Sequence, residues 1–129
     1  MLPKHLDRAY RRSHYSVAGF DLIVGRRSGA LDGLLSGMGA RAAVLMTAWN
    51  PASRRMPLLW NERRMAALRD RLGNTPALPA ASGCLGSWSE AQLLVVGDRR
   101  RLAVLARLFG QAAMVGLKRG QGAQLLPLV

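Results

Sequence analysis

The sequence has one cysteine, few acidic residues and no long apolar run among its 129 residues. The single cysteine, Cys84, cannot form an internal disulfide or a cysteine-rich zinc site, which makes the cytosol the default compartment. Every apolar run is shorter than the ~18 residues that a membrane helix needs. Residues 1–8 lack the apolar segment of a signal peptide. We therefore expect a cytoplasmic protein without a membrane partner.

Motifs of the common enzyme and nucleotide-binding families are also absent. The chain has no phosphate-binding loop, no G-x-S-x-G turn, no H-E-x-x-H pair and no G-x-G-x-x-G turn after a strand. His5 and His14 do not have the spacing of metal ligands, and Cys84 has no neighbouring base in the sequence. The sequence predicts neither a metal site nor a cofactor, and it does not decide whether the protein is an enzyme.

Apolar periodicity predicts one domain over residues 1–129, with residues 1–9 as a loose N-terminal extension. A short helical turn and an edge strand are expected within 8–17, and a long loop with at most one irregular strand within 74–87. Further strands are expected at 20–24, 42–49, 88–97, 112–117 and 123–128, and helices at 28–38, 57–72 and 98–109. This alternation favours an α/β sandwich with a mixed, mostly parallel sheet and about three helices, with α+β as the alternative.

The central strand is expected at 42–49, where eight successive residues carry no charge. Such a run is typical of a strand that is buried on both faces. Val44, Leu45 and Met46 should therefore be almost fully buried.

The charge is strongly positive, with 19 basic against seven acidic residues and a net charge of +12. Such a charge suggests nucleic acid or another polyanion as a partner. The triplet Arg99, Arg100 and Arg101 follows a predicted N-cap, Asp98, and cations at a helix N-terminus are unfavourable unless an anion binds there. However, the bases are dispersed, and the abundance of arginine, alanine, glycine and leucine is also what GC-rich codons produce. We expect weak, non-specific polyanion binding at this triplet.

Polar residues stand at five positions where the pattern predicts apolar structure. Thr47 and Asn50 close the most apolar strand, and Asn61 lies on the apolar stripe of a helix. Glu90 lies on a predicted strand, and Gln111 follows a glycine that ends a helix. Buried polar groups need hydrogen-bond partners. The residues alone are equally consistent with a structural polar network and with a ligand site.

Five segments, in chain order, carry a resemblance to a known family: Tyr10-Arg11-Arg12 to Tyr15, Thr47-Ala48-Trp49-Asn50-Pro51, Asn61-Glu62 with Leu68, Trp88-Ser89-Glu90, and Phe109-Gly110-Gln111. In this set the chain resembles the small bacterial family called domain of unknown function 3293. The sequence departs from that family at Leu59-Trp60, which is bulkier than the polar residues that the family tends to have there. The resemblance implies that one site contains Thr47, Asn50, Asn61, Glu90 and Gln111, and it names no substrate.

The first functional hypothesis is a pocket for a small polar ligand. The amides and Thr47 would orient the ligand, the ring of Trp49 or Trp88 would stack on it, and Glu90 is the candidate general acid or base. The structural alternative is an ion pair between Glu90 and an arginine that holds the 74–87 loop.

Two further hypotheses involve macromolecular partners. The first is a basic nucleic-acid-associated protein whose arginine pairs contact phosphates. The second is a protein-interaction module whose polar network is purely structural, with an apolar contact patch formed by Met56, Leu58, Leu59 and Trp60.

Overall fold

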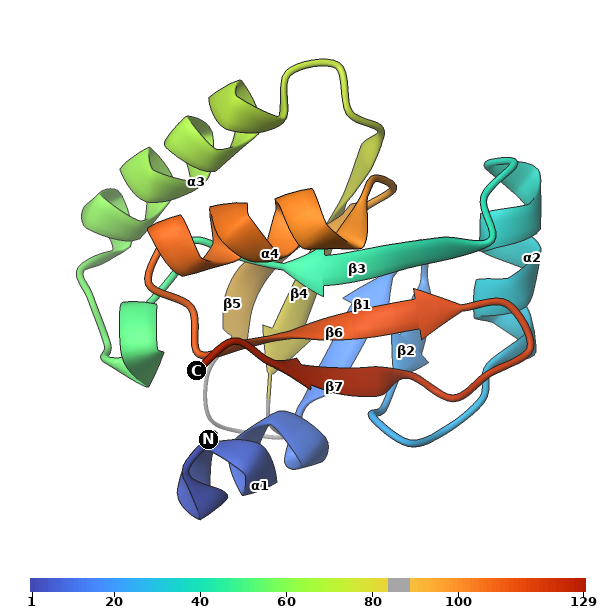
Figure 1. Cartoon of the computed structure of the whole chain (residues 1–129), viewed down its shortest axis with the longest axis horizontal. Helices are drawn as coiled ribbons and strands as arrows, with labels where there is room; N and C mark the ends of the chain where they lie inside the picture. The colour runs from blue at the N-terminus through green and yellow to red at the C-terminus, as the bar shows by residue number, and fades with distance from the viewer. Residues whose placement is uncertain (84–88) are drawn as a thin grey trace.

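The computed structural model describes residues 1–83 and 89–129, which form four α-helices, a short 3-10 turn and seven strands (Figure 1). The helices are α1 (Lys4–Arg12), α2 (Gly29–Gly37), α3 (Leu58–Leu72) and α4 (Arg99–Leu108), and the turn is η1 (Pro51–Ser53). The strands are β1 (His14–Val17), β2 (Phe20–Leu22), β3 (Ala42–Met46), β4 (Ala77–Gly83), β5 (Ser89–Val95), β6 (Ala113–Lys118) and β7 (Gln124–Pro127). None of the helices in these two ranges is long and apolar enough to cross a lipid bilayer.

All seven strands join one sheet in the order β2-β1-β4-β5-β3-β6-β7, and every neighbouring pair is antiparallel. The expectation of a mostly parallel sheet is therefore wrong, and the fold is a mixed α+β arrangement. The crossover through α4 does join two parallel strands, β5 and β6. Both of them pair with β3, which runs between them in the opposite direction. Helical crossovers thus connect strands of equal direction that are not neighbours in the sheet.

Strand β4 occupies half of the segment 74–87, which was expected to be a long loop with at most one irregular strand. Its sequence of alanines, a proline and a glycine has low strand propensity, and Pro79 in a central strand argues against such an assignment. Pairing overrides this local preference, because β4 lies between β1 and β5 and its register with β5 runs from Ala77↔Val95 to Gly83↔Ser89. β4 runs in the same direction as β3, and β5 pairs antiparallel with both strands. A direct helical crossover from β3 to β5, as the sequence predicted, would instead have made these two strands parallel.

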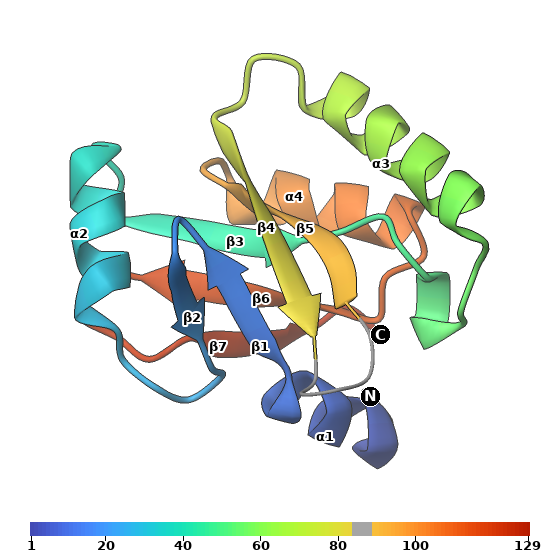
Figure 2. The ribbon, with the colours of Figure 1, turned by 180° about the vertical axis from the view of Figure 1, so that it is seen from behind.

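The sheet curls until its two edges meet. Val24, just after β2, forms a bridge with Ala123, just before β7, and the Gly25 N–H donates to the Ala123 carbonyl oxygen at 2.7 Å. The inner face of the curl holds a core with residues from β1, β2, β3, β5, β6 and β7, against which α2 packs. Side chains of the other face form a second core under α3 and α4, on the side opposite α1 (Figures 1 and 2).

Helix boundaries follow the capping residues that the sequence offers. The Ser28 hydroxyl accepts from the Leu31 N–H at 3.1 Å, and the Asp98 carboxylate accepts from the Arg101 N–H at 3.3 Å. The first helix is longer than the predicted helical turn. Residues 1–9, expected as a loose extension, include a buried Leu2 and most of α1, whose Leu6 packs against the inner core.

Burial of the central strand makes a direct stability test. Val44, Leu45 and Met46 are all at most 2% exposed, as the apolar run predicts. We expect Val44→Asp to abolish soluble expression, because an unpaired buried carboxylate costs several kcal/mol, comparable with the whole stability of a small domain, roughly 5–15 kcal/mol. Val104→Asp is the matched control, because Val104 on α4 is 53% exposed. A well-folded Val44→Asp protein would contradict the assignment of β3 to the core.

Candidate functional site

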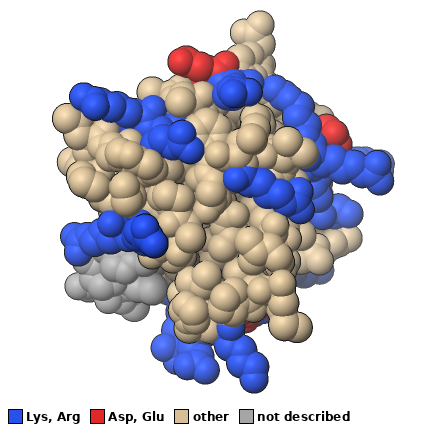
Figure 3. Space-filling model, turned by 60° about the vertical axis from the view of Figure 1, so that its left-hand side comes forward, with Lys and Arg blue, Asp and Glu red and all other residues tan. Residues whose placement is uncertain are grey.

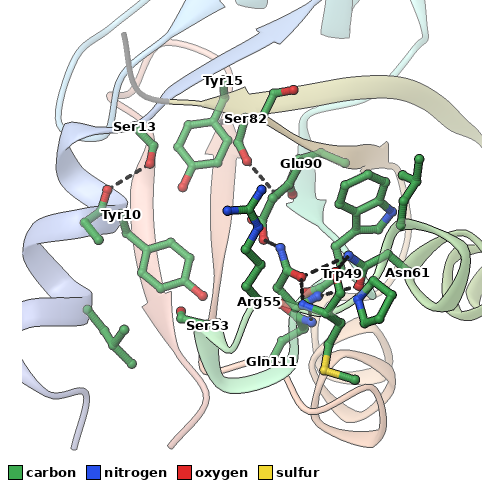
Figure 4. Close-up of a pocket in the computed structure, with 18 residues that line it drawn as sticks. Tyr10, Ser13, Tyr15, Trp49, Ser53, Arg55, Asn61, Ser82, Glu90 and Gln111 are labelled. Atoms are coloured by element: carbon green, nitrogen blue, oxygen red, sulfur yellow. Dashed lines mark hydrogen bonds between the residues drawn. The ribbon is translucent and has the colours of Figure 1, made fainter. Parts of the chain in front are cut away.

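A cavity of about 500 Å³ opens at one end of the inner sheet face (Figure 4). Its walls come from α1, from the loop between β3 and α3, and from the ends of β4 and β5. The side chains at its buried end are polar, and those at its exposed end include Arg55 and Leu58. The cavity lies where the apolar interior of the curled sheet stops.

The floor of the cavity is a polar stretch of an otherwise apolar sheet face. Successive strand residues point to opposite faces, so Glu90 and Gln92 share the face of Leu94, which belongs to the inner core. Ser82 on β4 is paired with Glu90, and its hydroxyl accepts from Gln92 Nε2 at 3.1 Å. Both Ser82 and Gln92 are buried. This face therefore changes from hydrocarbon to hydrogen-bonding groups within one strand.

Asn50 and Asn61 form a reciprocal pair that builds one wall. The Asn50 N–H donates to Asn61 Oδ1 at 3.0 Å, and Asn61 Nδ2 donates to Asn50 Oδ1 at 2.9 Å. Asn50 Oδ1 also accepts from the Met56 N–H at 2.8 Å, and Asn61 Nδ2 reaches the Met56 carbonyl oxygen at 3.2 Å. Asn61 is only 2% exposed, so its side chain forms hydrogen bonds with the loop and not with solvent. The two amides fasten the β3–α3 loop to the first turn of α3.

That loop has an unusual backbone that needs such support. Asn50, Ala52 and Ser53 have φ values of 46°, 53° and 60°, the left-handed region that side chains other than glycine seldom adopt. Gly110 packs against this loop with φ of 74°, and a Cβ atom there would lie 2.7 Å from Pro51 Cβ. The Ala52 N–H donates to the Gly110 carbonyl oxygen at 2.8 Å. Strained backbone of this kind persists where surrounding contacts hold it, often beside functional sites.

Glu90 is the acidic group of the cavity. Its Oε2 atom accepts from Asn50 Nδ2 at 2.6 Å. Burial raises the pKa of Glu90, and the hydrogen bond from Asn50 partly offsets that rise. No lysine, arginine or histidine lies within 4.0 Å of its carboxylate among the described residues. The structural alternative of a Glu90–arginine pair is therefore not formed among the described residues.

Tyr10 brings a phenol from α1 to the same cavity. Burial, the largest influence, and the nearby negative charge of Glu90 raise the pKa of Tyr10 to about 12. Hydrogen bonds to Ser53 and to the Ala113 backbone act in the opposite direction and lower it. The Tyr10 hydroxyl is therefore protonated at neutral pH and remains a hydrogen-bond donor. Figure 4 shows Tyr10 and Tyr15 on one side of Glu90 and Trp49 on the other.

Other residues of the predicted set have different positions. Trp49 and Gln111 line the cavity, and Gln111 Nε2 donates to the Trp49 carbonyl oxygen at 2.9 Å. Thr47 is not part of the cavity lining. Its hydroxyl donates to the Ala91 carbonyl oxygen at 2.6 Å and accepts from the Trp49 N–H at 3.0 Å, so it joins β3 to β5. Trp88 lies outside the described residues. A ligand-binding role for the set stays a prediction.

Several residues that line the cavity were not predicted from the sequence. Gln92 was detectable, because it lies two positions from Glu90 on a strand with alternating polarity. Ser82 could not be found once its segment was assigned to a loop. Tyr10 and Tyr15 belong to the N-terminal segment of the resemblance, but no local pattern places them opposite Glu90. Arg55 reads in sequence as one of many dispersed arginines.

Basic side chains are dispersed over the face of the molecule seen in Figure 3. Part of the predicted polyanion site makes contacts within the fold. Arg101 donates to Thr75 Oγ1 at 3.0 Å and to the Arg71 carbonyl oxygen at 3.3 Å. The guanidinium of Arg99 lies over Gly116, where an added Cβ would be 2.7 Å from Arg99 Nη2. Arg100 is exposed. The triplet is thus a poorer phosphate site than three free arginines would be.

Removal of the Asn61 amide tests the wall of the cavity. We expect Asn61→Ala to lower the free energy of unfolding by about 2–4 kcal/mol, because it removes the partners of half-buried main-chain groups of Asn50 and Met56 and leaves a gap at a buried position. The measurement is urea denaturation followed by circular dichroism. Asn74→Ala is the control, because Asn74 is exposed in the loop after α3. Equal effects of the two substitutions would refute the structural role of Asn61.

The raised pKa of Glu90 predicts how stability depends on pH. Because the pKa is higher in the folded than in the unfolded chain, the ionised form is disfavoured by folding, and stability falls as pH rises through the folded pKa. Glu90→Gln removes that charge and keeps an oxygen that can accept from Asn50. We expect its melting temperature to exceed that of the wild type by several degrees at neutral pH, with the difference shrinking in acid.

Glu62→Gln is the matched control for this measurement, because Glu62 is exposed on α3. Thermal unfolding of the three proteins at a series of pH values gives the comparison. A Glu90→Gln protein less stable than the wild type at neutral pH, or a difference that does not change with pH, would show that the buried carboxylate is not under strain.

Comparisons with known proteins give one family. No curated protein and no solved structure matches the chain. The sequence model of the family described as "Protein of unknown function (DUF3293)" matches residues 46–114, from the end of β3 into β6. This region includes Asn50, Asn61, Glu90 and Gln111, whereas Tyr10 and Tyr15 of the cavity lie outside it. Because the match spans more than half of the sequence, the chain belongs to the DUF3293 family.

Proposed function

We propose that this protein binds a small polar molecule in the cavity beside Glu90. The observation that carries the proposal is the polar floor of Glu90, Gln92 and Ser82 on the inner sheet face. A face that served only as core would be apolar, because buried polar groups cost free energy unless they are hydrogen-bonded. A polar ligand would supply partners for these groups. Cavities of roughly 300–1,000 Å³ are typical of small-molecule sites.

The polar residues of the cavity divide into a supporting and a ligand-facing group. Asn50 and Asn61 use their amides on each other, on the Met56 main chain and on Glu90, which supports the loop. The side-chain amide of Gln92 has four hydrogen-bonding positions, and its bond to Ser82 uses one of them. Gln92 and the second carboxylate oxygen of Glu90 are therefore the groups best suited to contact a ligand.

Binding is better supported than catalysis. The described lining residues include serines, but neither a histidine nor a lysine accompanies them as a base. Glu90 is the acidic group in that lining, so a mechanism with two carboxylates lacks its second member. Glu90 remains the candidate for a single proton transfer, with Tyr10 as a neutral hydrogen-bond donor opposite it.

Macromolecular partners have weaker support. Polyanion binding through Arg99, Arg100 and Arg101 is proposed as weak and salt-dependent, because two of these side chains have contacts within the fold. The predicted protein-contact patch is partly exposed, since Leu58 and Leu59 are 60% and 61% exposed. Leu58 also lines the cavity, so its exposure is equally consistent with the rim of a ligand site.

A variant that fills the cavity tests this function. Ala9 on α1 is exposed and lines the cavity, so we expect Ala9→Trp to close it without touching the Asn50–Asn61 pair. The probe is a fluorinated fragment library, with binding detected by ¹⁹F NMR. Fragments that bind the wild type should lose at least about tenfold in affinity for Ala9→Trp, a loss of about 1.4 kcal/mol.

The matched control is Ala66→Trp, an exposed helical alanine on α3 that does not line the cavity. It should bind the same fragments as the wild type, and their binding should shift the amide signals of Glu90 and Gln92. The proposal fails if no fragment shifts those signals, or if Ala9→Trp binds them as the wild type does.

A further inference from the structure

We propose that the ligand of this cavity is a small zwitterion, with a protonated amine or amidine against Glu90 and a carboxylate or phosphate against Arg55. This inference rests on the proposed function and adds the chemical class of the ligand. It follows from two groups of opposite charge that line one cavity without pairing with each other.

The inner charge is a carboxylate without a cation. Among the described residues, the Glu90 oxygens are approached by the Asn50 amide at 2.6 Å and by no basic group within 4.0 Å. A carboxylate held away from water gains most from a charge-assisted N–H donor. A protonated amine or an amidine of the ligand provides such a donor.

The second charge belongs to Arg55, which is next in the chain to a residue held by the hydrogen bonds of Asn50. Arg55 is exposed and lines the cavity. The next residue, Met56, donates its N–H to Asn50 Oδ1 at 2.8 Å, and Asn50 Nδ2 donates to Glu90. Within the described chain no acidic group lies within 4.0 Å of the Arg55 guanidinium. The Asn50 side chain therefore fixes the main chain beside Arg55 relative to Glu90.

Ligands with a single charge fit less well. A purely cationic ligand would have to approach a protein with a net charge of +12, and a purely anionic one would face the Glu90 carboxylate inside. A zwitterion can place its positive group against Glu90 and its negative group against Arg55. The same cavity is lined by both tyrosines of the chain and by Trp49, whose rings give flat apolar walls and attract a cation through their faces (Figure 4).

Three matched probes test the charge pattern: 4-(aminomethyl)benzoate carries both charges, benzylamine carries the cation and benzoate carries the anion. Binding to the wild type is measured by amide chemical-shift titration. We expect the zwitterion to bind about tenfold or more tightly than either single-charge probe. Glu90→Gln should lower the affinity for the zwitterion to that for benzoate. Arg55→Gln should lower the affinity for the zwitterion to that for benzylamine.

Arg54→Gln is the matched control, because Arg54 is exposed, adjacent in sequence and outside the cavity lining. It should leave the affinity of all three probes unchanged. Equal affinities of the three probes, or an Arg55→Gln protein that binds the zwitterion as the wild type does, would overturn the zwitterion proposal. If the fragments of the cavity test still bind, that outcome leaves the small-ligand function standing; if they also fail, both proposals fall.

Discussion

The reciprocal hydrogen bonds between Asn50 and Asn61 are the interaction on which the rest of the site depends. They hold three residues of the β3–α3 loop in the left-handed region, where only tertiary contacts can keep ordinary side chains. They also leave Asn50 Nδ2 directed at Glu90, and they place Arg55 at the same cavity through the Met56 N–H. A single pair of amides thus links the loop, the helix α3 and the acidic group on β5.

The curl of the sheet explains why this site is a cavity. The bridge between Val24 and Ala123 brings the two edges together, so that the inner face encloses a core instead of lying open. Helix α2 covers that core, and α1 contributes Leu6 and Tyr10 beside the cavity, where the strand residues become polar. The apolar part of the inner face stabilises the fold, whereas its polar end contains Glu90, whose charge is disfavoured by burial.

A free-energy cost of this kind is characteristic of binding sites. Burial disfavours the charge of Glu90, and no basic residue of the described chain relieves it. A purely structural network would relieve this cost by pairing the carboxylate with an arginine, the alternative that the sequence left open. A carboxylate without a basic partner, next to aromatic side chains, is the feature on which the proposed ligand site rests.

The sequence by itself determined the elements with strong local signals. Apolar periodicity placed α2, α3, α4 and the buried β3, and the side chain of Asp98 predicted a helix start, because these effects act between residues close in the chain. The polar exceptions Asn50, Asn61, Glu90 and Gln111 were also visible, since each interrupts an apolar pattern. Their common position followed from the family resemblance and not from local physics.

Only the tertiary structure decided which strands pair and which side chains meet. β4 has little strand propensity of its own and exists through its hydrogen bonds to β1 and β5, so the sequence suggested a loop and a parallel sheet. The same pairing brings Ser82 to Gln92, and the position of α1 brings Tyr10 near Glu90, across eighty positions of sequence. Contacts between distant segments depend on how the whole sheet curls, and local residue preferences contain no information on that closure.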